Sequence, residues 1–198
     1  QPEIQYLHAG DGYNLTAGAA YAHVEQNFKA STSTTFTPPV FPAPPGSTLK
    51  DKPDIDDARG YVYGNVSLPT PVTWTLGVSY QDYDEDAFSK TRANPKVGVQ
   101  WDVTDSLQLR GAYFKVIKPA LASNRTLEPT QVAGFNQFFD DSNGTKSTRF
   151  GGGLDRRITQ SVAVGAEATR RKMDTPEFVQ SGGSVSAKFD EQDEWYHR

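Results

Sequence analysis

Charged and amide side chains recur at every second position in several segments of this chain, and they are the first candidates for chemistry. In the segment 96–102 they are Lys96, Gln100 and Asp102, with a glycine between the first two. Because side chains alternate between the two faces of a β-strand, such a set lies on one face. We expect this face to line a polar interior. The candidate lining residues are Lys96, Gln100, Asp102, Gln108, Arg110, Arg149, Asp155, Arg157 and Glu167.

The arginines in this pattern allow two interpretations. They form a basic track for an anionic solute, or they pair with carboxylates on neighbouring strands as structural ladders. The second interpretation is favoured because the same face carries charges of both signs. The arginines concerned are Arg110, Arg149, Arg157 and Arg171, and the carboxylates are Asp102, Asp155 and Glu167. A tight turn at 104–106 also places Asp102 near Gln108, and Gln100 near Arg110, across two strands.

Signatures of catalysis and metal binding are absent from the sequence. The three histidines, His8, His23 and His197, are scattered without the spacing of zinc ligands, and no nucleophile elbow, P-loop or dinucleotide motif occurs. The chain contains no cysteine, which excludes thiolate metal sites and a disulfide scaffold. Its net charge of −4 argues against a nucleic-acid partner. We therefore expect a protein that is not an enzyme, with no catalytic residues, no metal site and no cofactor.

Three acidic stretches have a plain and a more specific interpretation. The run 140–144 resembles part of a calcium loop but lacks the downstream glutamate, so an ordinary acidic turn is favoured. The clusters 83–86 and 190–194 are expected to be solvated loops. The more specific alternative for the first cluster is bridging to lipopolysaccharide through divalent cations.

The segment 72–80 shows the pattern that must position such polar residues. Its large residues share one face of an extended strand, and its other face carries only small polar groups and glycine. The large residues are Val72, Trp74, Leu76, Val78 and Tyr80. In a transmembrane barrel the large face meets lipid and the small polar face meets the lumen. In a soluble β-sandwich the large face would instead form the core.

Nine such segments predict an all-β, antiparallel, up-and-down transmembrane β-barrel, or a segment of one, in a single domain covering 1–198. The expected strands are 3–9, 14–28, 57–68, 72–84, 95–103, 107–117, 147–157, 161–172 and 187–198. Short connections at 10–13, 69–71, 104–106 and 158–160 alternate with long ones at 29–56, 85–94, 118–146 and 173–186. This alternation places tight turns on one rim and long loops on the other, as in outer-membrane barrels.

Two of the long connections have recognisable content. The loop 29–56 is rich in Ser, Thr and Pro, so we expect it to be extended rather than folded. The loop 118–146 includes the strand-like stretch 131–141, which strand parity assigns to the outer loop. We expect it to belong to a hairpin that turns at Asn143 and Gly144, a favourable turn pair.

Two tryptophans support the membrane interpretation. Trp74 and Trp101 lie on the large face, each three residues from a tight turn, so they would stand at similar heights. Aromatic residues at one height form a girdle at the membrane interface of such barrels. The alternative is two core tryptophans of a soluble or surface-exposed β-sandwich that serves as a binding or adhesin module. A third hypothesis, an outer-membrane acyl hydrolase, requires a Ser–His pair, and neither His8 nor His23 has an evident serine partner.

The block from Asn94 to Lys115, continued by 127–135, resembles outer-membrane β-barrels of the TonB-dependent receptor type. In those barrels a P-K-hydrophobic-G strand precedes a short turn, a second strand and a long loop, followed by an L-x-P element; here these are Pro95–Gly98 and Leu127–Pro129. The resemblance implies a pore, receptor or export conduit in the bacterial outer membrane. Its partners would be outer-membrane lipid and a solute or polymer. The chain looks most similar to barrels that follow a tetratricopeptide region.

Three features of those receptors do not occur in this sequence: a plug domain, an energy-coupling box and a terminal aromatic residue. Nine crossings is also an odd number, whereas bacterial single-chain barrels have even numbers. We therefore expect a segment of a larger barrel, completed by further strands or by other subunits.

Overall fold

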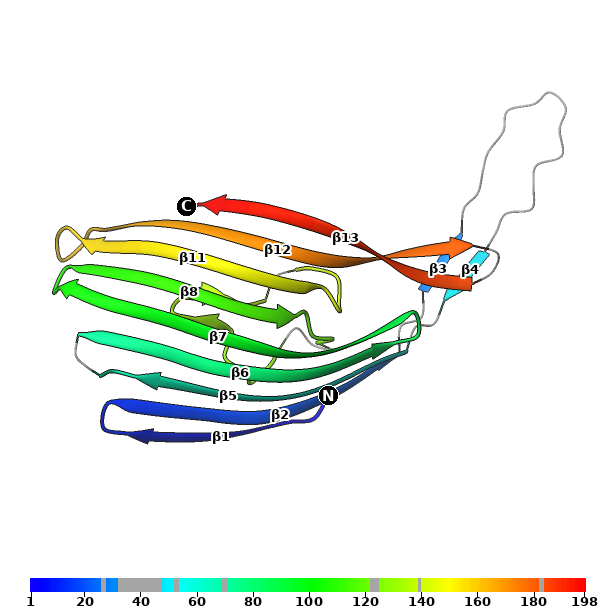
Figure 1. Cartoon of the computed structure of the whole chain (residues 1–198), viewed down its shortest axis with the longest axis horizontal. Helices are drawn as coiled ribbons and strands as arrows, with labels where there is room; N and C mark the ends of the chain where they lie inside the picture. The colour runs from blue at the N-terminus through cyan, green and yellow to red at the C-terminus, as the bar shows by residue number, and fades with distance from the viewer. Residues whose placement is uncertain are drawn as a thin grey trace, which may run out of the picture.

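The computed structural model describes residues 1–25, 28–31, 48–51, 54–68, 71–121, 125–138, 140–181 and 184–198. Nine antiparallel strands form one sheet in which every strand pairs with its neighbours in chain order (Figure 1). These strands are β1 (Glu3–Gly10), β2 (Tyr13–Glu25), β5 (Asp54–Val66), β6 (Val72–Glu85), β7 (Phe88–Thr104), β8 (Leu107–Ile117), β11 (Lys146–Arg157), β12 (Ala163–Ser181) and β13 (Ser184–His197). The nine predicted strands and the up-and-down order are therefore confirmed.

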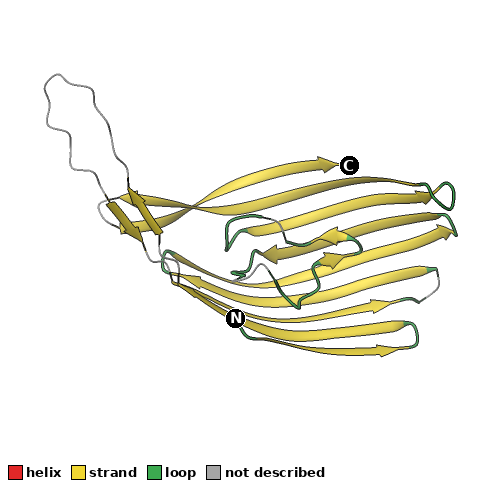
Figure 2. Cartoon of the chain, turned by 180° about the vertical axis from the view of Figure 1, so that it is seen from behind, coloured by secondary structure: helices red, strands yellow, loops and turns green. Residues whose placement is uncertain are grey.

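Two short hairpins interrupt the meander. One pairs β3 (Phe28–Ser31) with β4 (Thr48–Asp51), both within the expected loop 29–56, of which residues 32–47 and 52–53 lie outside the described residues. The other pairs β9 (Gln131–Val132) with β10 (Phe135–Asn136) and lies against one face of the large sheet (Figure 2). The predicted turn at Asn143–Gly144 is present, with a hydrogen bond of 3.2 Å from the Thr145 N–H to the Ser142 carbonyl, but it is not the turn of this hairpin. The hairpin turns at Ala133 and Gly134. Both of these residues have the positive φ of a type I′ turn, 47° and 84°.

Two of the predicted long connections, 85–94 and 173–186, were also wrong. β6 continues to Glu85 and β7 begins at Phe88, so only two residues join them, and β12 and β13 continue to Ser181 and Ser184. The apolar alternation that marked the strands does not reach the missed start of β7, because its outer positions Ser89 and Thr91 are polar. Backbone pairing continues there, so the strands extend beyond the apolar part of the wall.

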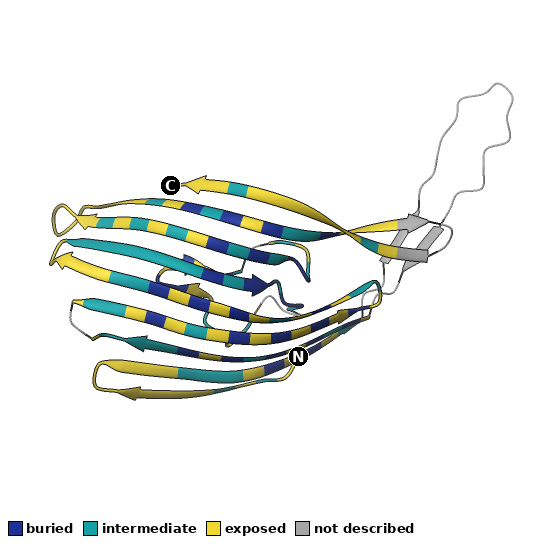
Figure 3. Cartoon of the chain, viewed as in Figure 1, coloured by how far each residue is buried: buried dark blue, intermediate teal, exposed yellow. Residues whose placement is uncertain are grey.

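Buried and exposed residues alternate along the strands of the large sheet (Figure 3), so its two faces differ. We call the face that carries the β9–β10 hairpin the inner face. On the opposite, outer face, large apolar side chains are exposed, including Leu76 at 50 % and Phe150 at 50 %. On the inner face polar side chains are buried, including Lys96 at 1 % and Arg149 at 5 %. Soluble proteins show the reverse arrangement, and an exposed apolar belt of this kind faces lipid in outer-membrane barrels.

Beyond the apolar belt, near the end of β2 and the start of β5, the outer face becomes polar. The Tyr21 hydroxyl donates a hydrogen bond of 2.5 Å to Asp56, whose carboxylate also lies 3.0 Å from Nδ1 of His23. This hydrogen bond to Asp56, with the charge of the same carboxylate, raises the pKa of His23 above its ordinary value of 6.5. The hydrogen bonds from Tyr21 and His23 correspondingly lower the pKa of Asp56.

The sheet is open at both edges in the described part of the chain. β1 pairs only with β2, and β13 pairs only with β12. Each edge strand exposes large apolar side chains at outer positions, including Ile4 at 73 % and Trp195 at 61 %. Among the described residues, no helix has the length and apolar character needed to cross a membrane.

We predict that Leu76→Arg destabilises the protein by about 2–4 kcal/mol, because a guanidinium in the middle of a lipid-facing belt loses its hydration. Gln108→Arg is the matched control. Its side chain is on the inner face, opposite Asp155 and 2.8 Å from Asp102, where a cation gains partners. Unfolding by denaturant in lipid vesicles measures both variants. Equal losses of stability would show that the two faces are wrongly assigned.

A second prediction concerns His23. Because its pKa is raised in the folded protein, the Asp56 contact stabilises the fold fully below pH 6.5 and is lost as the pH rises through the folded pKa. NMR titration of the His23 ring in detergent micelles is expected to give an apparent pKa above 6.5 in the native protein and a lower one in Asp56→Asn. An unchanged pKa in that variant would contradict the proposed cause. Asp82→Asn, on the neighbouring strand, is the control.

Candidate functional site

The segment 118–145, which joins β8 to β11, crosses the inner face of the sheet; we call it the inner loop. Its described residues are 118–121, 125–138 and 140–145. The β9–β10 hairpin forms its middle, and Figure 2 shows this hairpin in front of the long strands. The segment was predicted as a long loop of the outer rim, and its two ends lie at one rim, where Ile117 of β8 pairs with Lys146 of β11. From that rim the loop folds over the polar inner face of the wall, which provides it with partners along its length.

Glycines in the wall make room for the hairpin. A Cβ atom at Gly98 would lie 2.8 Å from the Cβ of Ala133 and 2.9 Å from Val132, and one at Gly151 would lie 2.5 Å from the Phe135 ring. Val132, Ala133 and Phe135 accordingly pack with Phe114 and Val116 of β8 in one buried apolar cluster. The absence of side chains at these wall positions therefore allows the hairpin to approach the sheet closely.

Three arginines on successive wall strands bind the inner loop at three points. Nη1 of Arg110 on β8 donates to the Ala133 carbonyl at 3.4 Å, and Nη1 of Arg149 on β11 donates to the Asn136 carbonyl at 2.9 Å. Nη1 of Arg171 on β12 donates to the Asp141 carboxylate at 2.7 Å. The arginines thus hold the loop against the wall with charge-assisted hydrogen bonds.

Wall carboxylates balance these arginines. Asp155 accepts a hydrogen bond from Nε of Arg110 at 2.5 Å, and Glu194 accepts one from Nη2 of Arg171 at 2.9 Å. Glu167 lies between Arg110 and Arg149, at 3.5 and 3.9 Å. Arg149 and Arg171 are direct cross-strand neighbours, so two like charges are tolerated because each has its own acceptors.

A second anchoring region lies on β5. The Tyr63 hydroxyl donates a hydrogen bond of 2.6 Å to Glu128 of the inner loop, and Arg59 lies 3.6 Å from the same carboxylate. The side chains of Arg59 and Glu128 are only 2 % and 3 % exposed. Two residues before Arg59, on the same face of β5, Asp57 accepts a hydrogen bond of 3.0 Å from the backbone N–H of Ala120. The inner loop is therefore bound to β5 as well as to β8, β11 and β12, all on the inner face of the sheet.

The residues predicted from the sequence divide into two groups. Arg110, Arg149, Asp155 and Glu167 meet in the ion-pair network described above. Lys96, Gln100, Asp102, Gln108 and Arg157 lie outside it on the inner face. Lys96 is buried and donates to the Lys115 carbonyl at 3.1 Å, and Asp102 and Gln108 pair with each other. Gln100 is opposite Arg110 in the register, and Arg157 is exposed near the tight-turn rim.

The anchoring residues Asp57, Arg59, Tyr63 and Glu128 were not predicted. The first three alternate along β5, so their common face was visible in the sequence. Glu128 lies in an irregular segment, where no periodicity indicates which way a side chain points. The sequence therefore contained a signal for the wall half of this region only.

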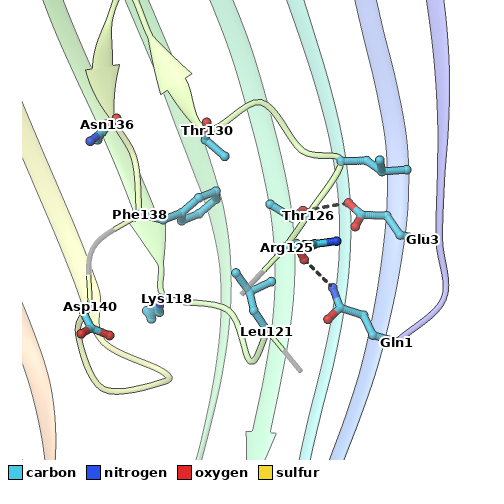
Figure 4. A pocket seen from close by; sticks show the side chains of 11 residues that line it. Gln1, Glu3, Lys118, Leu121, Arg125, Thr126, Thr130, Asn136, Phe138 and Asp140 are labelled. Carbon is cyan, nitrogen blue, oxygen red and sulfur yellow. Dashed lines mark hydrogen bonds between the residues drawn. The ribbon is translucent and has the colours of Figure 1, made fainter. Parts of the chain in front are cut away.

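A pocket of about 750 Å³ lies between the inner loop and the N-terminal end of β1 (Figure 4). The residues that line it are Gln1, Glu3, Lys118, Leu121, Arg125, Thr126, Leu127, Thr130, Asn136, Phe138 and Asp140. The Glu3 carboxylate is already engaged, because it accepts hydrogen bonds from Thr126 at 2.9 Å and from the Glu128 backbone at 3.2 Å. Among the described residues, neither Lys118 nor Arg125 forms an ion pair. The pocket thus combines two available cations with apolar side chains.

The two predicted interface tryptophans are on the outer face. Trp74 is 40 % and Trp101 is 46 % exposed. Trp74 pairs with Val99 and Trp101 with Val72, so the two rings are diagonal neighbours on adjacent strands near the tight-turn rim. Their role as a membrane-interface girdle stays a prediction.

A family model described as TonB dependent receptor-like, beta-barrel, matches residues 3–191. The chain belongs to this family. It is therefore part of a β-barrel of the bacterial outer membrane, and its exposed apolar face is embedded in lipid. No curated protein matches the chain.

Solved outer-membrane proteins share the architecture of this TonB dependent receptor-like chain. Outer-membrane expressed OmpT of Vibrio cholerae is 15 % identical with a TM-score of 0.56, and the trimer form of OmpT folded in vitro is 14 % identical with the same score. Each alignment covers 98 % of this chain and 53 % of the other, so the chain spans about half the length of these structures. The alcaligin receptor FauA of Bordetella pertussis is 12 % identical, over 94 % of this chain and 36 % of that one, with a TM-score of 0.47.

We predict that Glu128→Gln loosens the inner loop, because it leaves the buried Arg59 guanidinium without its carboxylate. Removing one partner of a buried ion pair costs about 3 kcal/mol. Trypsin cleavage after Arg125 in detergent reports this change, and we expect it to be much faster in the variant. Asp140→Asn, an exposed carboxylate of the same loop, serves as the control. Equal cleavage rates in both variants would show that Glu128 does not anchor the loop.

Proposed function

We propose that this chain forms part of the wall of a non-enzymatic outer-membrane conduit or receptor, and that the inner loop is its point of contact with the solute. The observation that carries this proposal is the position of the inner loop. It is bound to β5 on one side and to β8, β11 and β12 on the other, and it contributes most of the pocket in Figure 4. A loop bound in this way narrows the space enclosed by the wall.

The chemistry of the pocket favours a solute with an anionic group beside an apolar part. Lys118 and Arg125 are cations without an ion-pair partner in the described part of the chain, whereas Glu3 is occupied by its hydrogen bonds. Phe138, Leu121 and Leu127 supply apolar surface in the same pocket. Four charged side chains line the pocket. Asp140 is the one carboxylate among them that has no hydrogen-bond partner in the described part of the chain and would repel an anion, and it is exposed to solvent.

The wall requires further strands to enclose such a conduit. The edges of β1 and β13 present backbone N–H and C=O groups that lack partners in the described sheet. In a membrane each unpaired backbone group costs several kcal/mol, so a lipid-embedded sheet pairs its edges. We propose that additional strands of the same protein, or of another subunit, pair with β1 and β13.

Planar-bilayer conductance of the purified protein tests the proposal. We expect ion-conducting events with a preference for anions. This preference is expected to fall about twofold or more in the double variant Lys118→Glu, Arg125→Glu, because the substitutions reverse the sign of both cations that line the pocket. The matched control is Arg156→Glu, Lys172→Glu, which makes the same change in net charge at exposed positions of the outer face. A protein that inserts but does not conduct, or a selectivity that responds equally to both double variants, would contradict the proposal.

A further inference from the structure

The extension of β12 and β13 beyond the wall differs from the rest of the sheet. β11 begins at Lys146, opposite Asp174 of β12, and past that point β12 pairs only with β13. Residues 175–181 and 184–190 therefore form a two-stranded ribbon, which we call the β12–β13 extension. Two-stranded ribbons twist more strongly than wide sheets do, and Figure 1 shows the two strands crossing here.

The twist turns the lipid-facing side of the ribbon toward the inside of the wall. Phe178 and Phe189 have the outer-face parity of β12 and β13, yet both contact Phe88, which has the inner-face parity of β7. The ring centroids of Phe88 and Phe178 are 6.2 Å apart, and those of Phe88 and Phe189 are 5.4 Å apart at an interplanar angle of 90°. The extension thus reaches from β12 to β7 past the ends of β8 and β11, which lie between them in the sheet.

Lys90 adds a charged contact to this aromatic cluster. Its Nζ lies 3.7 Å from the centroid of the Phe189 ring and 5.1 Å from that of Phe88, and it donates to the Gly144 carbonyl at 3.3 Å. Lys90 is only 8 % exposed. A cation over an aromatic face in a site with little water is attracted by the ring quadrupole. The contact therefore links the extension to β7.

The same cluster holds the end of the inner loop. Gly144 has a φ of 73°, and a Cβ atom at this position would lie 2.7 Å from the Phe88 ring and 2.8 Å from that of Tyr83. The Tyr83 and Phe88 rings stack at 5.6 Å. The extension, the tip of β6–β7 and the last turn of the inner loop consequently meet at one point.

We propose that the β12–β13 extension is a movable lid over the long-loop rim, closed by the contact of Phe178 and Phe189 with Phe88 and Lys90, and that its closure fixes the end of the inner loop. In the described part of the chain, no backbone ladder joins the extension to β7. Phe178 and Phe189 also remain 49 % and 40 % exposed, so few contacts hold the closed position. Regions with few buried contacts are those that open locally. This inference concerns movement at the rim and does not depend on which solute the pocket takes.

Cysteine crosslinking tests the lid directly, because the native chain contains no cysteine. In Phe88→Cys, Phe178→Cys we expect a disulfide, or a link through a short bifunctional thiol reagent, within one molecule. Crosslinking is expected to slow trypsin cleavage after Arg125 at least about tenfold, and reduction of the disulfide restores the rate. It is also expected to lower bilayer conductance reversibly. The cleavage assay does not require conductance, so failure of the conduit proposal and failure of the lid are distinguishable.

The matched control is Asp84→Cys, Ser89→Cys, a registered cross-strand pair within the β6–β7 hairpin. A crosslink there joins two strands that are already paired and leaves the extension free, so cleavage and conductance stay unchanged. A crosslink between positions 88 and 178 that changes neither readout would overturn the lid. Failure of that pair to crosslink with either reagent would overturn it too, because the two hairpins would then not meet in the membrane.

Lys90→Met gives a second measurement without cysteines. Methionine keeps the apolar stem and removes the charge, so we expect the extension to open more often and trypsin cleavage of the inner loop to accelerate several-fold. Lys115→Met, at an outer-face position of β8, is the control. Equal rates in the two variants would show that Lys90 does not hold the lid.

Discussion

Backbone hydrogen bonding in lipid is the constraint on which this structure depends. A strand in the hydrocarbon region must pair its N–H and C=O groups with its neighbours, so nine long strands lie side by side in register. Pairing leaves only side chains to distinguish the two faces. The period of two then places Leu76 and Phe150 on one face and Lys96 and Arg149 on the other. The apolar exterior and polar interior are therefore two consequences of one requirement.

A polar inner face creates a second requirement, since buried charges need partners. Carboxylates of the wall provide part of the answer at Asp155, Glu167 and Glu194, and the inner loop provides the rest through Asp141, Glu128 and backbone carbonyls. The loop is polar where it meets arginines and apolar where it meets the wall glycines. Its polar residues contact the wall arginines and its apolar residues contact the wall glycines, which explains how an irregular segment adopts a defined position on the wall.

The sequence predicted the wall better than its contents. Alternation located all nine strands, because each crosses the belt with apolar residues on one side. It began β7 at 95 instead of at Phe88 and ended β12 at 172 instead of at Ser181, although backbone pairing continues over these residues. Strand parity placed the inner loop at the outer rim, but parity shows only at which rim a connection begins and not that the loop then folds over the inner face. Glu128 and Lys90 depend on contacts between distant segments, and no local pattern encodes them.

The anchoring contacts also determine an order of folding. Tyr63 and Glu128 are separated by 65 residues in the chain, and Ala120 and Asp57 by 63. Closing the intervening chain costs entropy, which the pairing of β5 through β8 reduces by bringing these segments together. We therefore expect the inner loop to settle after the wall strands have paired. The barrel wall acts as the template on which its own contents fold.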